Sequence, residues 1–369
     1  MYTEKDLVCL AKRQNNTKRT YLVVNKLQAK HIPVKPTQTN KMFDALANIL
    51  RESYKEETLL LVGFAETATA IGARIATVLN SYYMQTTREQ EDGVQYLYFS
   101  ESHSHATEQK LIRDELDQYQ NQIQRIVFIE DEVTTGNTIM KIVRILKEEY
   151  PDQFQFSVAS ILNGMNQASM ELYQQENIPV HYLVKTAHDT YPEKVKNYTG
   201  NGSYYEKKLA PVDLEYSVLS VGNSVDARHM VKGDSYQQAC ENLWEEIEKQ
   251  WKAQSANKIL VLGTEEFMYP AIHVASKIEQ QGKEVYCHAT TRSPIEVSKE
   301  DGYPLQERYE LASFYDKTRT TFVYDLKQYD QILVITDAKE FSEESVNSLL
   351  HGIQGSGNNK ITFIRWWKE

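Results

Sequence analysis

Short apolar runs alternate along this chain with segments of helical length, and this alternation constrains the fold more than any other feature. Residues 58–62 and 125–129 are rich in Leu, Ile, Val and Phe, as in strands that are buried on both faces. Segments with apolar residues at helical spacing follow them, over 68–79 and 137–150. Strands that alternate with helices form βαβ units. The sequence therefore predicts an α/β fold with a largely parallel sheet.

The second half of the chain repeats this pattern at similar spacing. Gly63 and Gly263 each end an apolar run, and each precedes a Thr-Thr-Arg triplet, by 23 and 27 residues respectively. A later apolar run ends at Asp131 in the first half and at Asp337 in the second, 45 and 47 residues after the triplet begins. Self-similarity at matched spacing indicates an internal repeat. We therefore expect a second α/β domain that is related to the first but degenerate.

Regular patterning fades between residues 185 and 234, where Gly, Asn and isolated polar residues accumulate. Such a stretch is typical of a connection between domains. The sequence predicts one domain over 1–210 and another over 211–369. Within the first, we expect a strand over 94–99 and an amphipathic helix over 109–122.

Composition excludes several classes of protein. The net charge is −10, which argues against a general nucleic-acid binder, because phosphate neutralisation needs clustered Lys and Arg. No apolar run approaches the length of a membrane span, and the N-terminus lacks the order of a secretory signal. The three cysteines, Cys9, Cys240 and Cys287, are far apart, so neither a disulfide framework nor structural zinc is expected. These features predict a cytoplasmic protein.

The segment 126–138 carries the clearest chemical signal. Glu130 and Asp131 end an apolar strand, at the edge where ligands bind to open α/β sheets. A short loop then opens a helix, whose free N–H groups and positive dipole end favour an anion. The hydroxyls and amides of this loop suit a phosphate monoester, and the carboxylates suit the hydroxyls of a sugar. The residues predicted to hold the phosphate are Thr134, Thr135, Gly136, Asn137 and Thr138. The alternative is an ordinary strand–turn–helix with an acidic end.

This segment closely resembles the phosphoribosyl pyrophosphate (PRPP) signature of the type I phosphoribosyltransferases. The resemblance implies that Glu130 and Asp131 act in catalysis and bind Mg²⁺, which prefers few carboxylates plus ligand oxygens. It also implies that a first loop after residue 63 contacts pyrophosphate, through Phe64, Ala65, Glu66 and Thr67. In the resembled family this loop often contains a cis peptide bond, which we expect at Ala65–Glu66.

Three further side chains lie where the resembled family has catalytic elements. Arg88 ends the next strand and is the candidate to bind the departing pyrophosphate; its alternative is a surface arginine. His103 and His105 lie in the position of a loop that closes over the sugar, where they would bind or protonate pyrophosphate. A solvated polar loop is the alternative for both, and no third residue at a recognisable spacing supports a zinc site. Lys30 lies where the family forms a hood over the acceptor, which would let it contact acceptor or pyrophosphate, although the sequence slightly favours a proline-rich entry loop.

The string Thr-Arg-Ser-Pro at 291–294 extends the resemblance to the second half. It is similar to bacterial proteins that fuse a phosphoribosyltransferase-like domain to a TRSP domain and occur with tellurium-resistance and stress-associated gene clusters. Arg292 and Ser293 are candidates to bind an anionic acceptor, with a structural arginine as the alternative. Gly136 has no counterpart after Asp337, so the second domain should not bind PRPP in the same way.

The resemblance implies a pentosyltransferase that moves the 5-phosphoribosyl group of PRPP to a nitrogenous, base-like acceptor and releases pyrophosphate. Thr134 replaces the acid that purine-salvage relatives carry, which leaves the acceptor open. Its partners would be small molecules, with neither nucleic acid nor membrane, and a homodimer is possible. A module that senses PRPP without turnover and an enzyme that runs in the reverse direction are the alternatives.

Overall fold

The computed structural model describes residues 1–14, 19–99, 109–251 and 255–367, and it divides the chain into two compact units. The first unit contains Met1, Asn40–Thr186 and Val225–Gln238. The second contains Tyr2–Thr39, Ala187–Ser224 and Ala239–Glu369. Each unit therefore consists of segments that are separated in the sequence, whereas the sequence predicted contiguous domains over 1–210 and 211–369. No helix among the described residues is long and apolar enough to cross a membrane.

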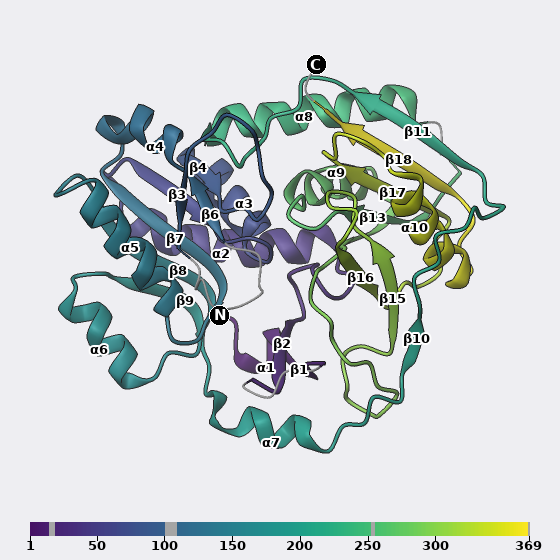
Figure 1. Ribbon diagram of the computed structural model, residues 1–369, viewed down its shortest axis with the longest axis horizontal. Coiled ribbons are helices and arrows are strands. Elements are labelled where there is room, and N and C mark those ends of the chain that lie inside the picture. The colour runs from purple at the N-terminus through teal and green to yellow at the C-terminus, as the bar shows by residue number, and fades with distance from the viewer. Residues whose placement is uncertain (15–18, 100–108, 252–254, 368–369) are drawn as a thin grey trace. The chain divides into compact units, whose positions relative to one another are not determined.

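A six-stranded sheet forms the centre of the first unit (Figure 1). Its strands, in spatial order, are β12 (Val231–Lys232), β4 (Tyr82–Gln85), β3 (Leu59–Gly63), β7 (Arg125–Val133), β8 (Gln155–Asn163) and β9 (Val180–Lys185). The last five run parallel, and only the short β12 is antiparallel to its neighbour. Every side chain of β3 is buried, which explains its unbroken apolar sequence.

One helix, α2 (Pro36–Ser53), precedes the parallel strands of the first unit and begins in the second unit, and the other helices lie between those strands. These are α3 (Thr69–Leu79), α4 (Arg113–Tyr119), α5 (Asn137–Glu149) and α6 (Gln167–Gln175), with a 3₁₀ turn η1 (Gln120–Gln122). In α5 the residues Ile139, Ile142, Val143 and Leu146 are buried at helical spacing, while the polar positions between them reach solvent. This helix packs one apolar face onto the protein, as its sequence predicts.

One predicted element of the first unit is wrong in part. Residues 109–122 do not form one helix, because Lys110–Ile112 is strand β6 and pairs with β5 (Tyr96–Tyr98). The helix α4 begins only at Arg113. The backbone of Lys110 also bonds to that of Thr87, and the buried residues Leu111 and Ile112 take part in this pairing rather than in a helix.

The second unit is built around a five-stranded parallel sheet (Figure 1). Its strands, in spatial order, are β11 (Tyr216–Val221), β18 (Ile361–Trp366), β17 (Gln331–Thr336), β13 (Lys258–Gly263) and β14 (Glu284–Ala289). A smaller sheet contains β10 (Ser203–Tyr205), β15 (Glu307–Ala312) and β16 (Thr320–Tyr324), and β1 (Val8–Lys12) pairs with β2 (Tyr21–Asn25). The helical elements are α1 (Glu4–Leu7), η2 (His188–Thr190), α7 (Tyr191–Lys196), α8 (Gly233–Gln250), which begins in the first unit, α9 (Tyr269–Gln280) and α10 (Glu343–Gly355).

The second half forms a parallel-sheet α/β unit, as predicted, and five strands of the first sheet have the same spatial order as the five of the second. The order β4-β3-β7-β8-β9 corresponds to β14-β13-β17-β18-β11. Two differences lie at the edges: β12 has no counterpart in the second sheet, and β9 follows the other strands in sequence whereas β11 precedes them. The second unit is therefore a permuted copy of the α/β architecture of the first.

Candidate functional site

The loops after β3, β4 and β7 meet at the carboxyl edge of the first sheet. The pairing of these parallel strands sets Gly63 beside both Gln85 and Ile129. Beyond this register, the Phe64 amide donates to the carbonyl of Ile129 at 3.1 Å, and the Thr86 amide donates to the carbonyl of Gly63 at 2.9 Å. Most of the predicted site residues follow directly from these three strand ends.

The first loop is held in place by hydrogen bonds to its backbone. The amide of Ala65 donates to Thr86 Oγ1 at 2.8 Å, and Gln109 Nε2 donates to the carbonyl of Ala65 at 3.2 Å. The peptide bond Ala65–Glu66 is cis, as predicted. Sequence reasoning missed Gln109, because a single glutamine beside a polar loop gives no signal of its partner.

Glu130 and Asp131 lie half-buried at the end of β7, beside the first loop. Thr67 Oγ1 donates to Asp131 Oδ1 at 2.8 Å, which links the two loops through side chains. Burial, followed by repulsion from Asp131 and Glu132, raises the pKa of Glu130 well above its ordinary value. Burial and Glu132 likewise raise the pKa of Asp131. These carboxylates therefore lie where a divalent cation or a set of hydroxyl donors would stabilise their charge.

The raised pKa of Glu130 predicts a pH dependence of stability. A carboxyl group with a raised pKa in the folded protein binds its proton more tightly there than in the unfolded chain. Its contribution therefore falls as pH rises from the ordinary value of 4.5 through the raised value. We expect Glu130→Gln to be more stable than the unmodified protein at pH 8, measured by urea unfolding, with a smaller difference at pH 4.5. Glu171→Gln, an exposed position on α6, is the control; equal pH slopes for all three proteins would contradict the prediction.

The loop from β7 to α5 is shaped for a small anion. Gly136 has a φ of 74°, and a Cβ there would lie 2.5 Å from the hydroxyl oxygen of Tyr173, which itself donates to the Gly136 carbonyl at 2.7 Å. Only glycine fits this left-handed, closely packed position. Gly136 offers no side chain to cap α5, and Thr135, Asn137 and Thr138 are exposed. The Asn137 amide makes one long hydrogen bond, of 3.4 Å, to Thr135 Oγ1, so this end of the helix is accessible to a ligand.

The structure describes two of the remaining predicted residues of the first unit, Arg88 and Thr134. Arg88 follows β4, three residues beyond Gln85, and is half-buried at the same sheet edge. Thr134 is half-buried, between Asp131 and the exposed part of the loop. His103 and His105 lie outside the described residues.

The second unit reproduces the scaffold of this site but not its chemistry. The Glu265 amide donates to Thr290 Oγ1 at 3.0 Å, and the Thr290 amide donates to the Gly263 carbonyl at 3.0 Å, as Ala65, Thr86 and Gly63 do in the first unit. Among its described residues, the second unit has no phosphate loop at the corresponding helix start. Instead, Ser342 Oγ accepts from the Ser345 amide and caps α10, and Glu343 and Glu344 occupy the first turn of the helix. Acids at this position oppose an anion.

Internal ion pairs fill the second unit's counterpart of the first loop. Arg319 Nη1 lies 2.7 Å from Glu265 Oε2, and Arg292 Nη2 lies 3.1 Å from Glu266 Oε1. The side chains of the two glutamates are 2% and 1% exposed. Lys30 Nζ is also buried there and donates to the carbonyls of Glu265 and Thr290, so the expected position of Lys30 over an acceptor is wrong. The arginine of the Thr-Arg-Ser-Pro string thus has an acid partner within its own unit.

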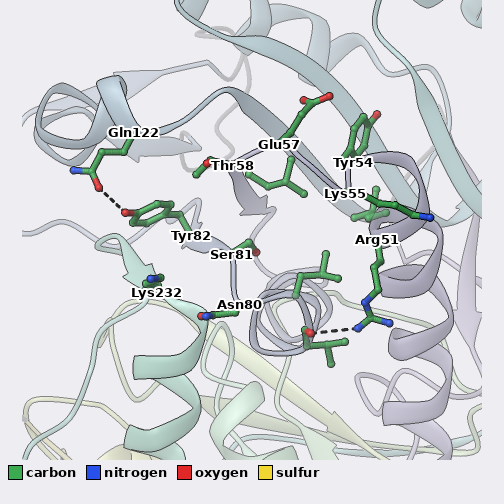
Figure 2. Close-up of a pocket in the computed structure, with 14 residues that line it drawn as sticks. Arg51, Tyr54, Lys55, Glu57, Thr58, Asn80, Ser81, Tyr82, Gln122 and Lys232 are labelled. Atoms are coloured by element: carbon green, nitrogen blue, oxygen red, sulfur yellow. Dashed lines mark hydrogen bonds between the residues drawn. The ribbon is translucent and has the colours of Figure 1, made fainter.

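A cavity of about 550 Å³ lies at the opposite edge of the first sheet, where its strands begin (Figure 2). Thr58, Ser81 and Gln122 line it, just before β3, near the start of β4 and before β7. The residues predicted for PRPP follow the other ends of these strands. The cavity is therefore separate from the candidate site.

Comparisons with known proteins agree with this architecture. The profile of the family described as phosphoribosyl transferase matches residues 7–188, and that of the TRSP domain, C-terminal to this transferase domain, matches residues 226–353. No curated protein matches the chain. Among solved structures, the adenine phosphoribosyltransferase of Rhodothermus marinus is 14% identical, with a TM-score of 0.36 over 49% of this chain and 96% of that one. The enzyme from Leishmania donovani is 17% identical, with a TM-score of 0.37 over 53% and 84%.

Proposed function

The chain belongs to the family of phosphoribosyl transferases that carry a C-terminal TRSP domain, and from this premise we propose that its first unit is a PRPP-dependent transferase. The reaction moves a 5-phosphoribosyl group to a nitrogenous acceptor. The observation that carries the proposal is the bond from Thr67 to Asp131, which joins the first loop to the acids beside the phosphate loop.

The 5-phosphate of PRPP binds at the start of α5. Its oxygens accept from the amides and hydroxyls of Thr134, Thr135, Gly136, Asn137 and Thr138. The absence of a side-chain cap on this helix and the exposure of Thr135, Asn137 and Thr138 support this assignment. The left-handed Gly136 brings the backbone close to the phosphate.

Glu130 and Asp131 accept from the ribose hydroxyls and hold Mg²⁺. Burial and the neighbouring acids raise the pKa of both carboxyl groups, so a cation or hydroxyl donors beside them would stabilise their charged forms. When bound, Mg²⁺ neutralises pyrophosphate oxygens. The Asp131 oxygen that already accepts from Thr67 keeps the carboxylate in one orientation.

The first loop and Arg88 stabilise the departing pyrophosphate. The C1–O bond to pyrophosphate breaks and its electron pair leaves with pyrophosphate, while the acceptor nitrogen forms the new bond to C1 and loses its proton. Charge develops on an oxocarbenium-like sugar, so fixed electrostatic groups and exclusion of water dominate the chemistry. The backbone of Phe64 to Thr67 faces the leaving group, and His103 and His105 are proposed to close over it. The protein supplies no covalent nucleophile.

Replacing Arg88 by alanine tests the assignment of the leaving-group side. A hydrogen bond to a charged group contributes about 1.5–3 kcal/mol, so kcat/KM for PRPP should fall about 10- to 100-fold. Arg88→Lys should retain part of the activity, because it keeps the charge without the planar fork. Arg144→Ala, at an exposed position of α5, is the matched control. Equal activity of the Arg88 and Arg144 variants would refute the role.

Incubation with PRPP, Mg²⁺ and a set of nitrogenous bases, monitored by pyrophosphate release, tests the function itself. Acceptor-dependent release identifies a transferase. Saturable PRPP binding without release under every acceptor favours a sensing module, the second candidate. Calorimetry should give one PRPP per chain, because capped α10 and the acids at its start leave no phosphate loop in the second unit.

The role of Arg292 and Ser293 in binding an anionic acceptor stays a prediction. For Arg292 it would require the guanidinium to bind the anion while it is paired with Glu266. A role near tellurium-resistance functions, which comes from the family resemblance, and a cytoplasmic location, which comes from the cysteine usage and the N-terminal sequence, both stay proposals.

A further inference from the structure

A histidine and three carboxylates, none of them assigned to PRPP, converge in the first unit. His229 Nε2 lies 3.0 Å from Glu91 Oε2, and His229 Nδ1 lies 2.7 Å from Glu115 Oε1. Ligand atoms of Glu91, Asp226 and His229 all lie within 4.8 Å of one another. Imidazole with carboxylates is a donor set for a divalent transition metal. We propose that Glu91, Asp226 and His229 bind one Zn²⁺ ion.

The distances suit a single small cation. Zinc binds nitrogen and oxygen ligands at about 2.0–2.2 Å in tetrahedral geometry, so its ligand atoms lie about 3.3–3.6 Å from one another. The separations within this cluster reach that arrangement by small side-chain rotations. Three protein ligands leave a fourth position for water.

The second nitrogen of the histidine already has the partner that a metal-binding imidazole needs. Histidines that bind metal through one nitrogen usually donate from the other to a carboxylate, which fixes the tautomer and the ring orientation. Glu115, on α4, provides that carboxylate, and its side chain is 17% exposed. Glu115 is thus a positioning residue, and Nε2 of His229 is the ligand atom.

The backbone holds the ligand residues in place. The His229 amide donates to the Asp226 carbonyl at 3.2 Å, and the Gln85 amide donates to the Ala227 carbonyl at 2.8 Å, so this turn is fixed to β4. The Glu91 amide donates to the hydroxyl of Tyr96 at 3.0 Å. A bound ion would therefore join two segments that the fold already fixes.

The charge of the cluster also favours a cation. Glu91, Glu115 and Asp226 lie around the imidazole, and the Arg228 amide and guanidinium donate to Oδ1 of Asp226. Three carboxylates against one guanidinium leave the cluster with excess negative charge, so it attracts a divalent cation.

Zinc titration of the full-length protein, stripped of metal by chelation, tests the proposal. With a chromophoric competitor, one Zn²⁺ per chain should bind at micromolar concentration or below. X-ray absorption at the zinc edge should show one nitrogen and several oxygens. Millimolar Mg²⁺ should not displace the ion, because Mg²⁺ prefers oxygen ligands in octahedral geometry.

Variants separate the ligands from their surroundings. His229→Gln and Glu91→Gln should weaken zinc binding at least about 100-fold, and Glu115→Gln about 10- to 100-fold. His181→Gln, which removes a histidine bonded to Tyr54 in the same unit, and Glu176→Gln should leave the affinity unchanged. The thermal midpoint without metal shows whether each variant folds. Absence of saturable uptake, or uptake that survives His229→Gln in a folded protein, would overturn the proposal and leave the cluster as an ion-paired clasp.

Discussion

Replacing Glu130 and Asp131 together by alanine is expected to lower the rate of pyrophosphate release at least about 1,000-fold, while the fold is retained. Removing one preorganised electrostatic group at a reacting centre commonly costs about 10²–10³ in rate, and here two adjacent groups are lost. Both side chains are half-buried, and their negative charges repel each other. Their removal should therefore not destabilise the first unit. Pyrophosphate release and urea unfolding of the same preparation measure the two effects.

The second unit provides an internal control for this experiment. Asp337 follows β17 as Asp131 ends the apolar run of β7, and it accepts from the hydroxyl of Tyr315 at 2.6 Å. Asp337→Asn should leave pyrophosphate release unchanged, because the second unit has no phosphate loop. If the double variant of Glu130 and Asp131 kept the activity of the unmodified protein, the transferase assignment would fail.

Replacing Arg319 by methionine should destabilise the second unit by about 3–5 kcal/mol. The guanidinium is paired with Glu265, whose side chain is 2% exposed, and its loss leaves a buried carboxylate without that positive charge. Denaturant unfolding, followed by the fluorescence of tryptophans in the second unit, measures the loss. PRPP binding to the first unit should remain, which distinguishes local destabilisation from global unfolding.

Two further variants isolate the cause. Lys249→Met removes an exposed ion pair with Glu246 and should change stability by at most about 1 kcal/mol. The combination Glu265→Gln with Arg319→Met should be more stable than Arg319→Met alone, because it removes the uncompensated charge. An equal loss in the Arg319→Met and Lys249→Met variants would show that the buried pair contributes no more than a surface pair.

The sequence was sufficient to predict the loops that follow buried strands. The apolar runs that end at Gly63 and Ile129 force two parallel strands into a sheet, and the residues after them must then meet at one edge. The cis bond at Ala65–Glu66 and the related strand order of the two units also agree with the predictions from the sequence. These features could be predicted because hydrophobic periodicity and loop composition depend only on residues that are close in the sequence.

Features that depend on pairing between distant segments could not be predicted. The polar residues of 109–122 suit a helix, yet Lys110–Ile112 forms a strand because Tyr96–Tyr98 is available to pair with it. The sequence suggested Lys30 as part of a hood over the acceptor, but the carbonyls that bind it lie more than 230 residues away in the chain. His229 and Glu91 are likewise separated by 138 residues, so no spacing rule brings them together.

Because each unit contains segments from separate parts of the sequence, a single cut in the chain cannot separate the two units. A fragment that ends near residue 210 would lack Val231–Lys232. Tyr82–Gln85 would then be an exposed edge strand, able to pair with strands of other chains. The complementary fragment would lack the hairpin of Val8–Lys12 and Tyr21–Asn25. Neither piece is self-sufficient, so proteolysis between the halves should yield products that aggregate or remain associated rather than two independent proteins.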